Sequence, residues 1–277
     1  MRWRSDFWVS GLQYLILGLW GLIVLIPLLN LLMLSLKSLP GIVARPFSLP
    51  STLHFSNYVN AWKLGDLGIY LFNTAWMSVL AVAVVLGLGS LAGYVLGRFD
   101  FKGNRFLYLV FLAGLALPIQ MIAVPYFGMM EALNLINSPW SLVLLYGASG
   151  LSFSVFILTA FARNLPTELE EAAWVEGATP TYVYWRIALP LMRPILASVG
   201  LFNFVSAWNG FFFPLILLTS RHNMTITVGI LSFIGEHLTE WQYLLPALVI
   251  SMLPPILVFL IVSRQFIRGL TSGALKI

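Results

Sequence analysis

Four carboxylates stand close together in a chain that is otherwise strongly apolar. They lie in the polar segment 163–194, here called the docking segment, which reads R-N-L-P-T-E-L-E-E-A-A-W-V-E-G-A-T-P-T-Y-V-Y-W-R-I-A-L-P-L-M-R-P. These four of the chain's ten acidic residues are Glu168, Glu170, Glu171 and Glu176. Uncharged stretches flank the segment on both sides. We interpret it as a docking surface, and an ordinary capped loop is the alternative.

The spacing of these residues predicts a short helix. Thr167 and Glu170 have the S/T-x-x-E spacing of a capping box, in which hydroxyl and carboxylate satisfy free N–H groups at a helix start. The helix should therefore begin at Thr167. Glu168 and Glu171 then join Glu170 near its positive end, which favours carboxylates. Gly177 is suited to end the helix, since glycine readily takes the left-handed conformation found just past a helix.

A second helix is predicted to follow directly. Thr179 can cap it, with Pro180 at the first helical position, where the missing N–H is harmless. Pro190 and Pro194 are expected to break it. The docking segment thus consists of two short helices about a glycine hinge.

The first of these helices has a face of small residues. It is about three turns long and marginal by itself in water. Leu169, Ala172, Ala173 and Glu176 share one face at i, i+3, i+4 and i+7, and the centre of this face is two alanines. Small side chains permit close approach by another surface.

The residues E-A-A-W-V-E-G-A at 171–178, with I-A-L-P at 187–190, resemble the EAA loop of ATP-binding-cassette importer permeases, E-A-A-x-x-D-G-A with I-x-L-P downstream. Glu176 stands where that family usually has Asp, and the charge is kept. The resemblance implies a coupling helix that sits in a cleft of a cytoplasmic ATPase, with Glu171 paired to a basic residue there. The implied docking residues are Glu168, Glu171, Ala172, Ala173, Glu176, Gly177 and Ala178.

The composition is that of a polytopic membrane protein. The chain has 277 residues, is 60% hydrophobic and only 9% charged, and has a mean hydropathy of +0.91. Charged residues make up nearer a quarter of soluble domains. The net charge of +5 does not indicate nucleic acid, because the basic residues are scattered among the flanks of apolar stretches. With no cysteine, disulfides, thiol nucleophiles and cysteine-ligated metals are excluded.

Six stretches between charged residues are each longer than the ~20 apolar residues needed to cross a bilayer. We therefore predict an all-α integral membrane protein, a single permease domain over 1–277 with six transmembrane helices. The expected spans are 12–36, 69–97, 106–130, 139–162, 195–219 and 243–264. The first is too long for the apolar region of a signal peptide.

The basic residues predict the orientation of these spans. Six spans put both termini on one side, and if that side is the cytoplasm it holds eleven of the fifteen lysines and arginines. This bias satisfies the positive-inside rule. The docking segment, between the fourth and fifth spans, is then cytoplasmic, as docking to an ATPase requires.

Several small and polar residues lie within the predicted spans. Gly89, Gly93 and Gly97 have the four-residue spacing that lets membrane helices pack closely. Prolines interrupt the third span, at Pro118 and Pro125, and such breaks are tolerated where backbone is buried in protein or faces water. Candidates for the solute path, each also explicable by packing alone, are Gln120, Tyr126, Asn203, Trp208 and Asn209.

The resemblance covers nearly the whole chain. W-N-G-F-F-F-P-L at 208–215 is similar to the family's W-N-D-F-L-W-P-L, with Gly210 and Phe213 departing from it, and the tail 264–277 resembles R-G-L-T-x-G-A-x-K. It points to carbohydrate permeases of the maltose-transporter type, the shorter of two paired permeases. It implies a second permease subunit, two ATPase subunits that bind ATP and Mg²⁺, an extracytoplasmic solute-binding protein, and the cytoplasmic membrane of a bacterium or archaeon.

The sequence lacks the residues for several other chemistries. No G-x-x-x-x-G-K-S/T occurs, so the chain has no P-loop and no cofactor site of its own is expected. The sequence contains no G-x-S-x-G or H-E-x-x-H motif, so it lacks the residues of a membrane hydrolase. No ionisable residue lies deep in a span, where proton-coupled transporters keep a relay. An ATP-independent secondary transporter or facilitator stays the alternative, although it leaves the docking segment without a role. The absence of arginines from the spans favours a neutral sugar.

Overall fold

Helices make up most of the backbone. The computed structural model describes the backbone of residues 2–235 and 239–274, and side chains from 13 to 235 and from 239 to 263. Within these ranges there is no strand, only an isolated antiparallel bridge between Ile234 and Thr239. The expected all-α class is confirmed. The side chains of the tail 264–277, which carries part of the resemblance, lie outside the described residues.

The chain divides into two compact units. Unit 1 comprises Met1–Leu67 and Ile230–Met252, and unit 2 comprises Gly68–Gly229 and Leu253–Ile277. Helix α4 begins with the last residue of unit 1, and α14 contributes to both units. The elements of unit 1 are α1 (Arg2–Ser35), α2 (Leu39–Ala44), α3 (Ser56–Leu64), the 3₁₀ turn η4 (Ile230–Phe233) and the first part of α14 (Trp241–Ala274).

In unit 1 a buried lysine organises the connection after α1. Lys37 is 3% exposed, and its ammonium donates to the carbonyl oxygen of Arg45 at 2.8 Å. The amide of Asn57 donates to the carbonyls of Ser35, at 3.1 Å, and of Lys37, at 2.9 Å. Because a buried charge needs partners, the carbonyl of Arg45 fixes the path of the loop around the ammonium. The two bonds from Asn57 fix the backbone at the end of α1.

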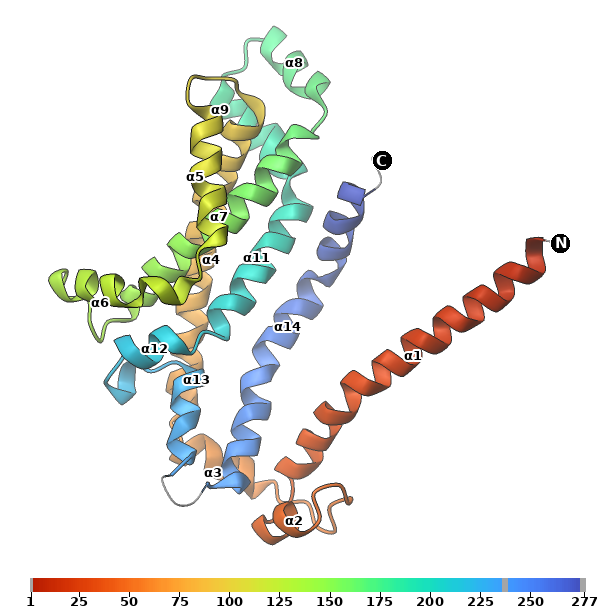
Figure 1. Ribbon diagram of the computed structural model, residues 1–277, viewed down its shortest axis with the longest axis vertical. Coiled ribbons are helices and arrows are strands. Elements are labelled where there is room, and N and C mark those ends of the chain that lie inside the picture. Colours follow the sequence, from red (N-terminus) through yellow and green to blue (C-terminus); the bar gives the residue numbers. More distant parts are fainter. Residues whose placement is uncertain (1, 236–238, 275–277) are drawn as a thin grey trace. The chain divides into compact units, whose positions relative to one another are not determined.

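Unit 2 carries most of the predicted membrane helices. Figure 1 shows α4, α5, α7 and α11 running side by side, with α8 and α9 at one end and α6 and α12 towards the other. Its elements, besides the rest of α14, are α4 (Leu67–Arg98), α5 (Asn104–Ala116), η1 (Ile119–Ile122), α6 (Ala123–Ala132), α7 (Pro139–Arg163), α8 (Thr167–Val175), α9 (Pro180–Val183), the π turn η2 (Tyr184–Ala188), α10 (Leu189–Leu191), α11 (Arg193–Trp208), α12 (Phe212–Leu217), η3 (Arg221–Asn223) and α13 (Ile226–Gly229).

Helix α7 is the centre of unit 2, where it packs against α4, α5, α11 and α12. Its contact with α4 runs along the glycine row. A Cβ added at Gly93 would lie 2.7 Å from the Cβ of Leu158, and Cβ atoms at Gly97 and Gly89 would lie 2.9 and 3.3 Å from side-chain carbons of α7. Real Cβ atoms do not approach so closely at the first two positions, so the spacing of these two helices depends on glycine there.

Four predicted spans are continuous helices long and apolar enough to cross a membrane. They are Gln13–Ser35, Leu67–Arg98, Pro139–Arg163 and Trp241–Ser263. These agree with the predictions for 12–36, 69–97, 139–162 and 243–264. Two bent helix pairs raise the number of candidate spans to as many as six.

The span predicted over 106–130 is not one straight helix. Its two parts, Asn104–Ala116 and Ile119–Ala132, meet at 96°. Pro118 explains the break, because a proline disfavours helical backbone in the residue before it, and Leu117 is extended (φ −93°, ψ 119°). The thirteen residues of α5 rise only about 20 Å, less than the ~30 Å of a bilayer core.

The span predicted over 195–219 is also wrong as a single helix. Helix α11 ends at Trp208 and α12 begins at Phe212. The ring of Pro214 would clash with the carbonyl of Gly210 in a continuous helix. That carbonyl instead accepts a hydrogen bond from the hydroxyl of Thr227 at 2.6 Å. The bent pair in this part of the chain is Pro180–Leu191 with Arg193–Trp208, at 74°.

Candidate functional site: the docking segment and a cavity in unit 2

Helix α8 begins at Thr167, as predicted, but without the capping box. Pro166 precedes the helix as its N-cap (φ −58°, ψ 123°), Thr167 is the first helical residue, and no side chain caps the start. The carboxylate of Glu170 cannot reach back to this end because it is drawn towards α4. The prediction of a Thr167–Glu170 capping box is therefore wrong, although the helix start it gave is right.

Glu170 instead forms a buried ion pair with Arg98, the last residue of α4. Glu170 is 2% exposed, and Nη2 of Arg98 lies 3.0 Å from its Oε2, to which Nε also donates at 3.1 Å. Nη1 of Arg98 donates to the carbonyl of Leu165 at 3.3 Å. Among the side chains that the structure describes, this is the one ion pair. It ties the docking segment to the end of a membrane helix.

The turn after α8 has the predicted glycine conformation. Gly177 has φ +82°, and nothing lies within 4 Å of a Cβ built there, so the backbone and not crowding requires glycine. The N–H of Gly177 donates to the carbonyl of Trp174 and that of Ala178 to the carbonyl of Ala173, both at 2.9 Å. This is the Schellman arrangement, which satisfies the last carbonyls of a helix.

The second helix begins as predicted and ends in an irregular turn. The hydroxyl of Thr179 accepts from the N–H of Tyr182 at 3.3 Å, and Pro180 occupies the first turn. The chain then widens into the π turn η2 ahead of Pro190, because this proline has no N–H for the usual bond. The sharp bend follows between Leu191 and Arg193.

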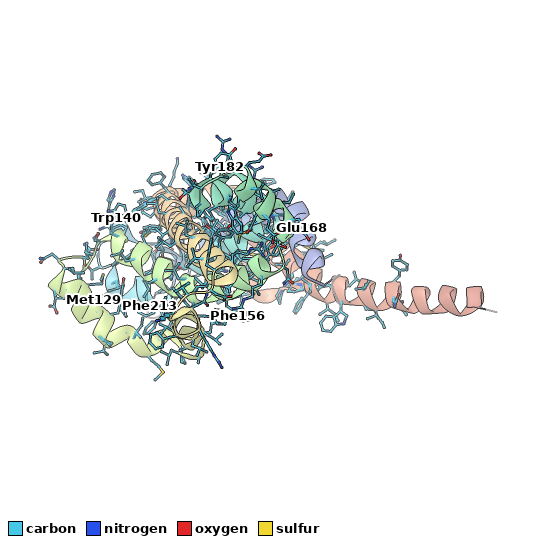
Figure 2. All side chains as sticks on the ribbon, turned by 90° about the horizontal axis from the view of Figure 1, so that it is seen from above. Met129, Trp140, Phe156, Glu168, Tyr182 and Phe213 are labelled. Atoms are coloured by element: carbon cyan, nitrogen blue, oxygen red, sulfur yellow. The ribbon has the colours of Figure 1, made fainter. Side chains whose placement is uncertain are left out.

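Almost all of α8 apart from Glu170 is exposed. The exposed side chains include apolar ones, and that of Val175 is 89% exposed. Figure 2 looks onto the end of unit 2 that carries Glu168 of α8 and Tyr182 of α9. A hollow of about 410 Å³ at the turn between these helices is lined by Ala173, Glu176, Gly177, Ala178, Thr179 and Tyr182. The other implied docking residues lie on the exposed surface of α8: Glu168, Glu171 and Ala172.

A second concave site lies between α7 and α11. It is a cavity of about 350 Å³, and its nine lining residues are Ile119, Tyr146, Ser149, Gly150, Phe153, Phe202, Asn203, Ser206 and Ala207. Asn203 donates to the hydroxyl of Ser154 at 3.0 Å and to the carbonyl of Val199 at 2.8 Å. A Cβ on Gly150 would come within 2.3 Å of Oδ1 of Asn203, so glycine keeps this wall open. No lining residue is charged.

Of the five residues predicted for the solute path, Asn203 is the one that lines this cavity. Tyr126 is buried, and its hydroxyl donates to the carbonyl of Ser141. Trp208 is 2% exposed and packs against Phe204 with ring centroids 5.5 Å apart. The remaining two, Gln120 in η1 and Asn209 after α11, are exposed.

Sequence reasoning missed the other cavity residues. Those from α7, which are Tyr146, Ser149, Gly150 and Phe153, recur at i, i+3, i+4 and i+7, the spacing of one helix face. Two hydroxyls, two aromatic rings and a glycine share one face of this apolar span, and that pattern could have predicted the cavity wall. The pattern is missed when polar residues are considered one at a time.

Comparison with known proteins identifies the chain. Residues 86–272 match the family described as binding-protein-dependent transport system inner membrane component. The chain belongs to this family. It is therefore a multi-pass membrane permease, and the family resemblance carried by the EAA loop is confirmed.

Two relatives of this permease align over most of its length. The diacetylchitobiose uptake system permease protein NgcG of Streptomyces coelicolor is 35% identical over 274 residues, covering 98% of this chain and 91% of the relative. The arabinooligosaccharides transport system permease protein AraQ of Halalkalibacterium halodurans is 32% identical over 260 residues, covering 92% of each. Both are sugar permeases by name.

The fold of the permease also matches a solved structure. A chain of a bacterial ABC transporter involved in the import of the acidic polysaccharide alginate aligns with a TM-score of 0.82, covering 95% of this chain and 98% of that one. The sequences are 23% identical, so this match supports the fold and not the solute.

Proposed function

We propose that this permease is one of two membrane subunits of an ATP-driven importer for a neutral sugar or oligosaccharide. It works with a second permease subunit, two ATPase subunits and an extracytoplasmic solute-binding protein in the cytoplasmic membrane of a bacterium or archaeon. ATP and Mg²⁺ bind the ATPase subunits, because this sequence has no P-loop. The family and the named sugar permeases among its relatives support this assignment.

The proposed topology has six spans with both termini in the cytoplasm. The four continuous helices each cross once, and the bent pair of α5 with α6 and the helix α11 provide the other crossings. The excess of lysine and arginine at the ends assigned to the cytoplasm supports this orientation. The docking segment is then on the cytoplasmic side, within reach of an ATPase.

The observation that carries the proposal is how α8 is held. Its exposed surface presents carboxylates, alanines and apolar side chains. Its one buried residue, Glu170, forms an ion pair with Arg98 at the end of α4. When ATPase subunits close on α8, the ion pair passes the displacement to the membrane helix. ATP drives transport only if the closed ATPase fits one facing state better than the other.

The chemistry of the cavity between α7 and α11 supports a neutral sugar. Its wall combines the rings of Tyr146 and Phe153 with the amide of Asn203 and two serines, without a charge. Aromatic faces stack on the apolar faces of sugar rings, and amides and hydroxyls bond sugar hydroxyls. We assign the solute contact to Asn203, and not to Tyr126 or Trp208, whose side chains are engaged in packing.

The proposal is tested by purifying the tagged chain in mild detergent and identifying what accompanies it. We expect a second permease and an ATPase, with ATP hydrolysis that increases when a sugar-loaded binding protein is added. Recovery of the chain alone, with solute flux into liposomes that needs no ATP, would contradict the proposal and establish a facilitator.

A further inference from the structure

A basic pocket lies beside the end of α7, and its one residue from the docking segment is Arg163, which is not among the implied docking residues of α8. It measures about 800 Å³ and is formed by the turn from α4 to α5, the start of α5 and Arg163. Its lining residues are Asp100, Phe101, Lys102, Asn104, Arg105, Tyr108, Leu109 and Arg163. The lining residues thus include three cations and one carboxylate, and none of them forms an ion pair within the described side chains.

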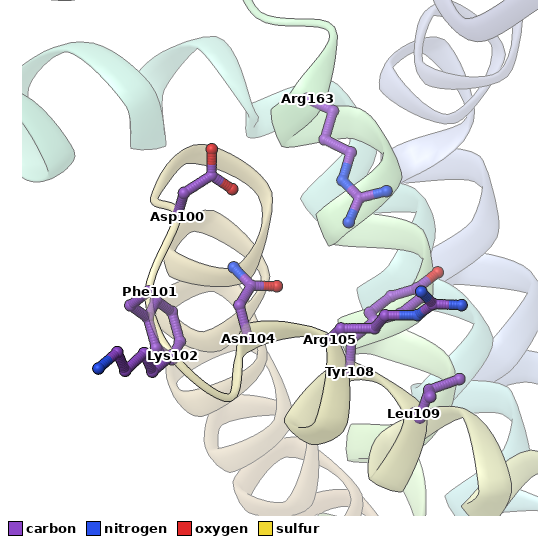
Figure 3. A pocket seen from close by; sticks show the side chains of 8 residues that line it. All are labelled: Asp100, Phe101, Lys102, Asn104, Arg105, Tyr108, Leu109 and Arg163. Carbon is purple, nitrogen blue, oxygen red and sulfur yellow. The ribbon is translucent and has the colours of Figure 1, made fainter.

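Two arginines from different helices converge in this pocket. Figure 3 shows Arg163 of α7 and Arg105 of α5 extending towards the same space beside Tyr108, with the amide of Asn104 facing it and Lys102 pointing away. The guanidinium of Arg163 lies over the ring of Tyr108, 5.4 Å from its centroid. This cation–π contact holds one guanidinium in place while its N–H groups stay free for an anion.

We propose that this pocket binds the phosphodiester headgroup of an anionic phospholipid. Guanidinium groups recognise phosphate oxygens through paired N–H donors. Basic pockets between membrane helices on the cytoplasmic side suit such headgroups. The assignment rests on the proposed topology, in which Arg163 ends a span at the cytoplasmic surface.

Two observations favour a lipid over a soluble phosphate. Leu109 in the pocket wall is 48% exposed, and on the same helix Phe106 and Val110 are 68% and 52% exposed, so apolar surface for an acyl chain adjoins the basic groups. Asp100 adds a carboxylate that repels a free dianion more strongly than a singly charged phosphodiester. The pocket therefore favours the singly charged phosphodiester of a membrane lipid over free inorganic phosphate.

The test measures which lipids the purified importer complex retains. The complex is incubated in vesicles of phosphatidylcholine that contain a minority of phosphatidylglycerol, extracted, and its bound lipids are counted by native mass spectrometry. We expect phosphatidylglycerol to be enriched over phosphatidylcholine. Each of Arg105→Gln and Arg163→Gln should lower this enrichment about fivefold, the effect of one cation near an anionic surface.

Matched variants separate the pocket from general charge. Arg221→Gln removes an exposed arginine elsewhere in unit 2 and should leave the enrichment unchanged, and Asp100→Asn should increase it. If Arg163→Gln does not assemble, Arg105→Gln and Asp100→Asn decide. Subunit composition is measured in the same spectra, so failure of the importer proposal is seen separately.

Three results would overturn the lipid site. The first is equal retention of the two lipids by the unchanged complex. The second is displacement of phosphatidylglycerol by millimolar inorganic phosphate, which would make this a site for a soluble anion. The third is loss of ATPase subunits from Arg105→Gln with lipid retention intact, which would make the pocket part of the protein interface.

Discussion

Two connections of unit 2 are held in opposite ways. Within the docking segment, α8 is attached by one buried ion pair, between Arg98 and Glu170, and is otherwise exposed. The later part of the segment is partly buried, and Tyr184 there shares a hydrogen bond of 2.7 Å with Ser90. The connection 218–229 is held by many neutral hydrogen bonds. The amide of Asn73 donates to the carbonyls of His222, at 2.7 Å, and Met224, at 3.1 Å.

Asn137 is the centre of the neutral network. It has φ +57°, its Oδ1 accepts from the N–H groups of Thr219 and Ser220 at 3.0 and 2.9 Å, and its carbonyl accepts from Asn223 at 2.6 Å. The hydroxyl of Thr74 also accepts a hydrogen bond from the N–H of Ile226 at 2.8 Å. Distributed bonds of this kind fix a connection as part of the scaffold.

The two kinds of attachment allow different movements. A network of short neutral bonds resists displacement in every direction, because any movement breaks several bonds at once. Helix α8, attached at a single buried pair, can be pushed by a partner, and the pair transmits the push to α4. We therefore expect α8 to be the moving part and the connection 218–229 to be the static part.

Removing the ion pair from one side should have the largest effect. Arg98→Met leaves the carboxylate of Glu170 buried without its cation, which we expect to cost about 3–5 kcal/mol of unfolding free energy. Denaturant or thermal unfolding of the purified complex measures it. The double variant Arg98→Met with Glu170→Leu should recover most of the loss, since a buried pair is often replaceable by apolar groups. A double variant no more stable than the single one would contradict the ion-pair account.

The neutral network should be weakened more moderately at its centre. Asn137→Ala removes the side-chain acceptor of two backbone N–H groups. Alanine also adopts the left-handed conformation less readily than asparagine does. We expect the two effects together to lower the free energy of unfolding by about 2 kcal/mol. Asn137→Gly is the matched control, because it loses the same acceptor but tolerates the backbone. Thermal unfolding should rank alanine below glycine, and the reverse order would contradict the backbone argument.

Gly177 should show a smaller cost, confined to the turn after α8. Gly177→Ala places a Cβ in the left-handed conformation, which costs roughly 1–2 kcal/mol. Gly128→Ala is the control, because a Cβ there also meets nothing within 4 Å but the residue lies inside α6 without a positive φ. Hydrogen exchange should rise around α8 for the first variant alone. Unchanged exchange at Gly177→Ala would show that the turn does not need its glycine.

The sequence predicted local features of the docking segment well, because they depend on neighbouring residues. The start of α8, the left-handed Gly177 and the Thr179 cap are all of this kind. It failed for Glu170, whose partner Arg98 lies 72 residues away. A glutamate three residues after a threonine has the same local pattern whether it caps a helix or crosses to another one.

The membrane helices divide in the same way. Long apolar runs gave four spans correctly, since length and composition decide them, and two of these helices continue through internal prolines, at Pro27 in α1 and at Pro254 and Pro255 in α14. Pro118 was seen as an interruption, but the 96° bend depends on what α5 and α6 pack against, which no local pattern encodes. The cavity residues other than Asn203 were missed because the pairing of the α7 and α11 faces is a tertiary feature.

The most direct test of the docking account is Glu171→Lys in the assembled importer. Glu171 is exposed on α8, so the change should leave stability within about 0.5 kcal/mol. If α8 docks on the ATPase as proposed, the change reverses a charge at that interface. We then expect sugar uptake into proteoliposomes to fall about tenfold or more, while ATP hydrolysis loses its response to the binding protein. Glu131→Lys, an exposed carboxylate on α6, is the control and should transport normally. Full, ATP-coupled uptake by Glu171→Lys in a complete complex would contradict the account.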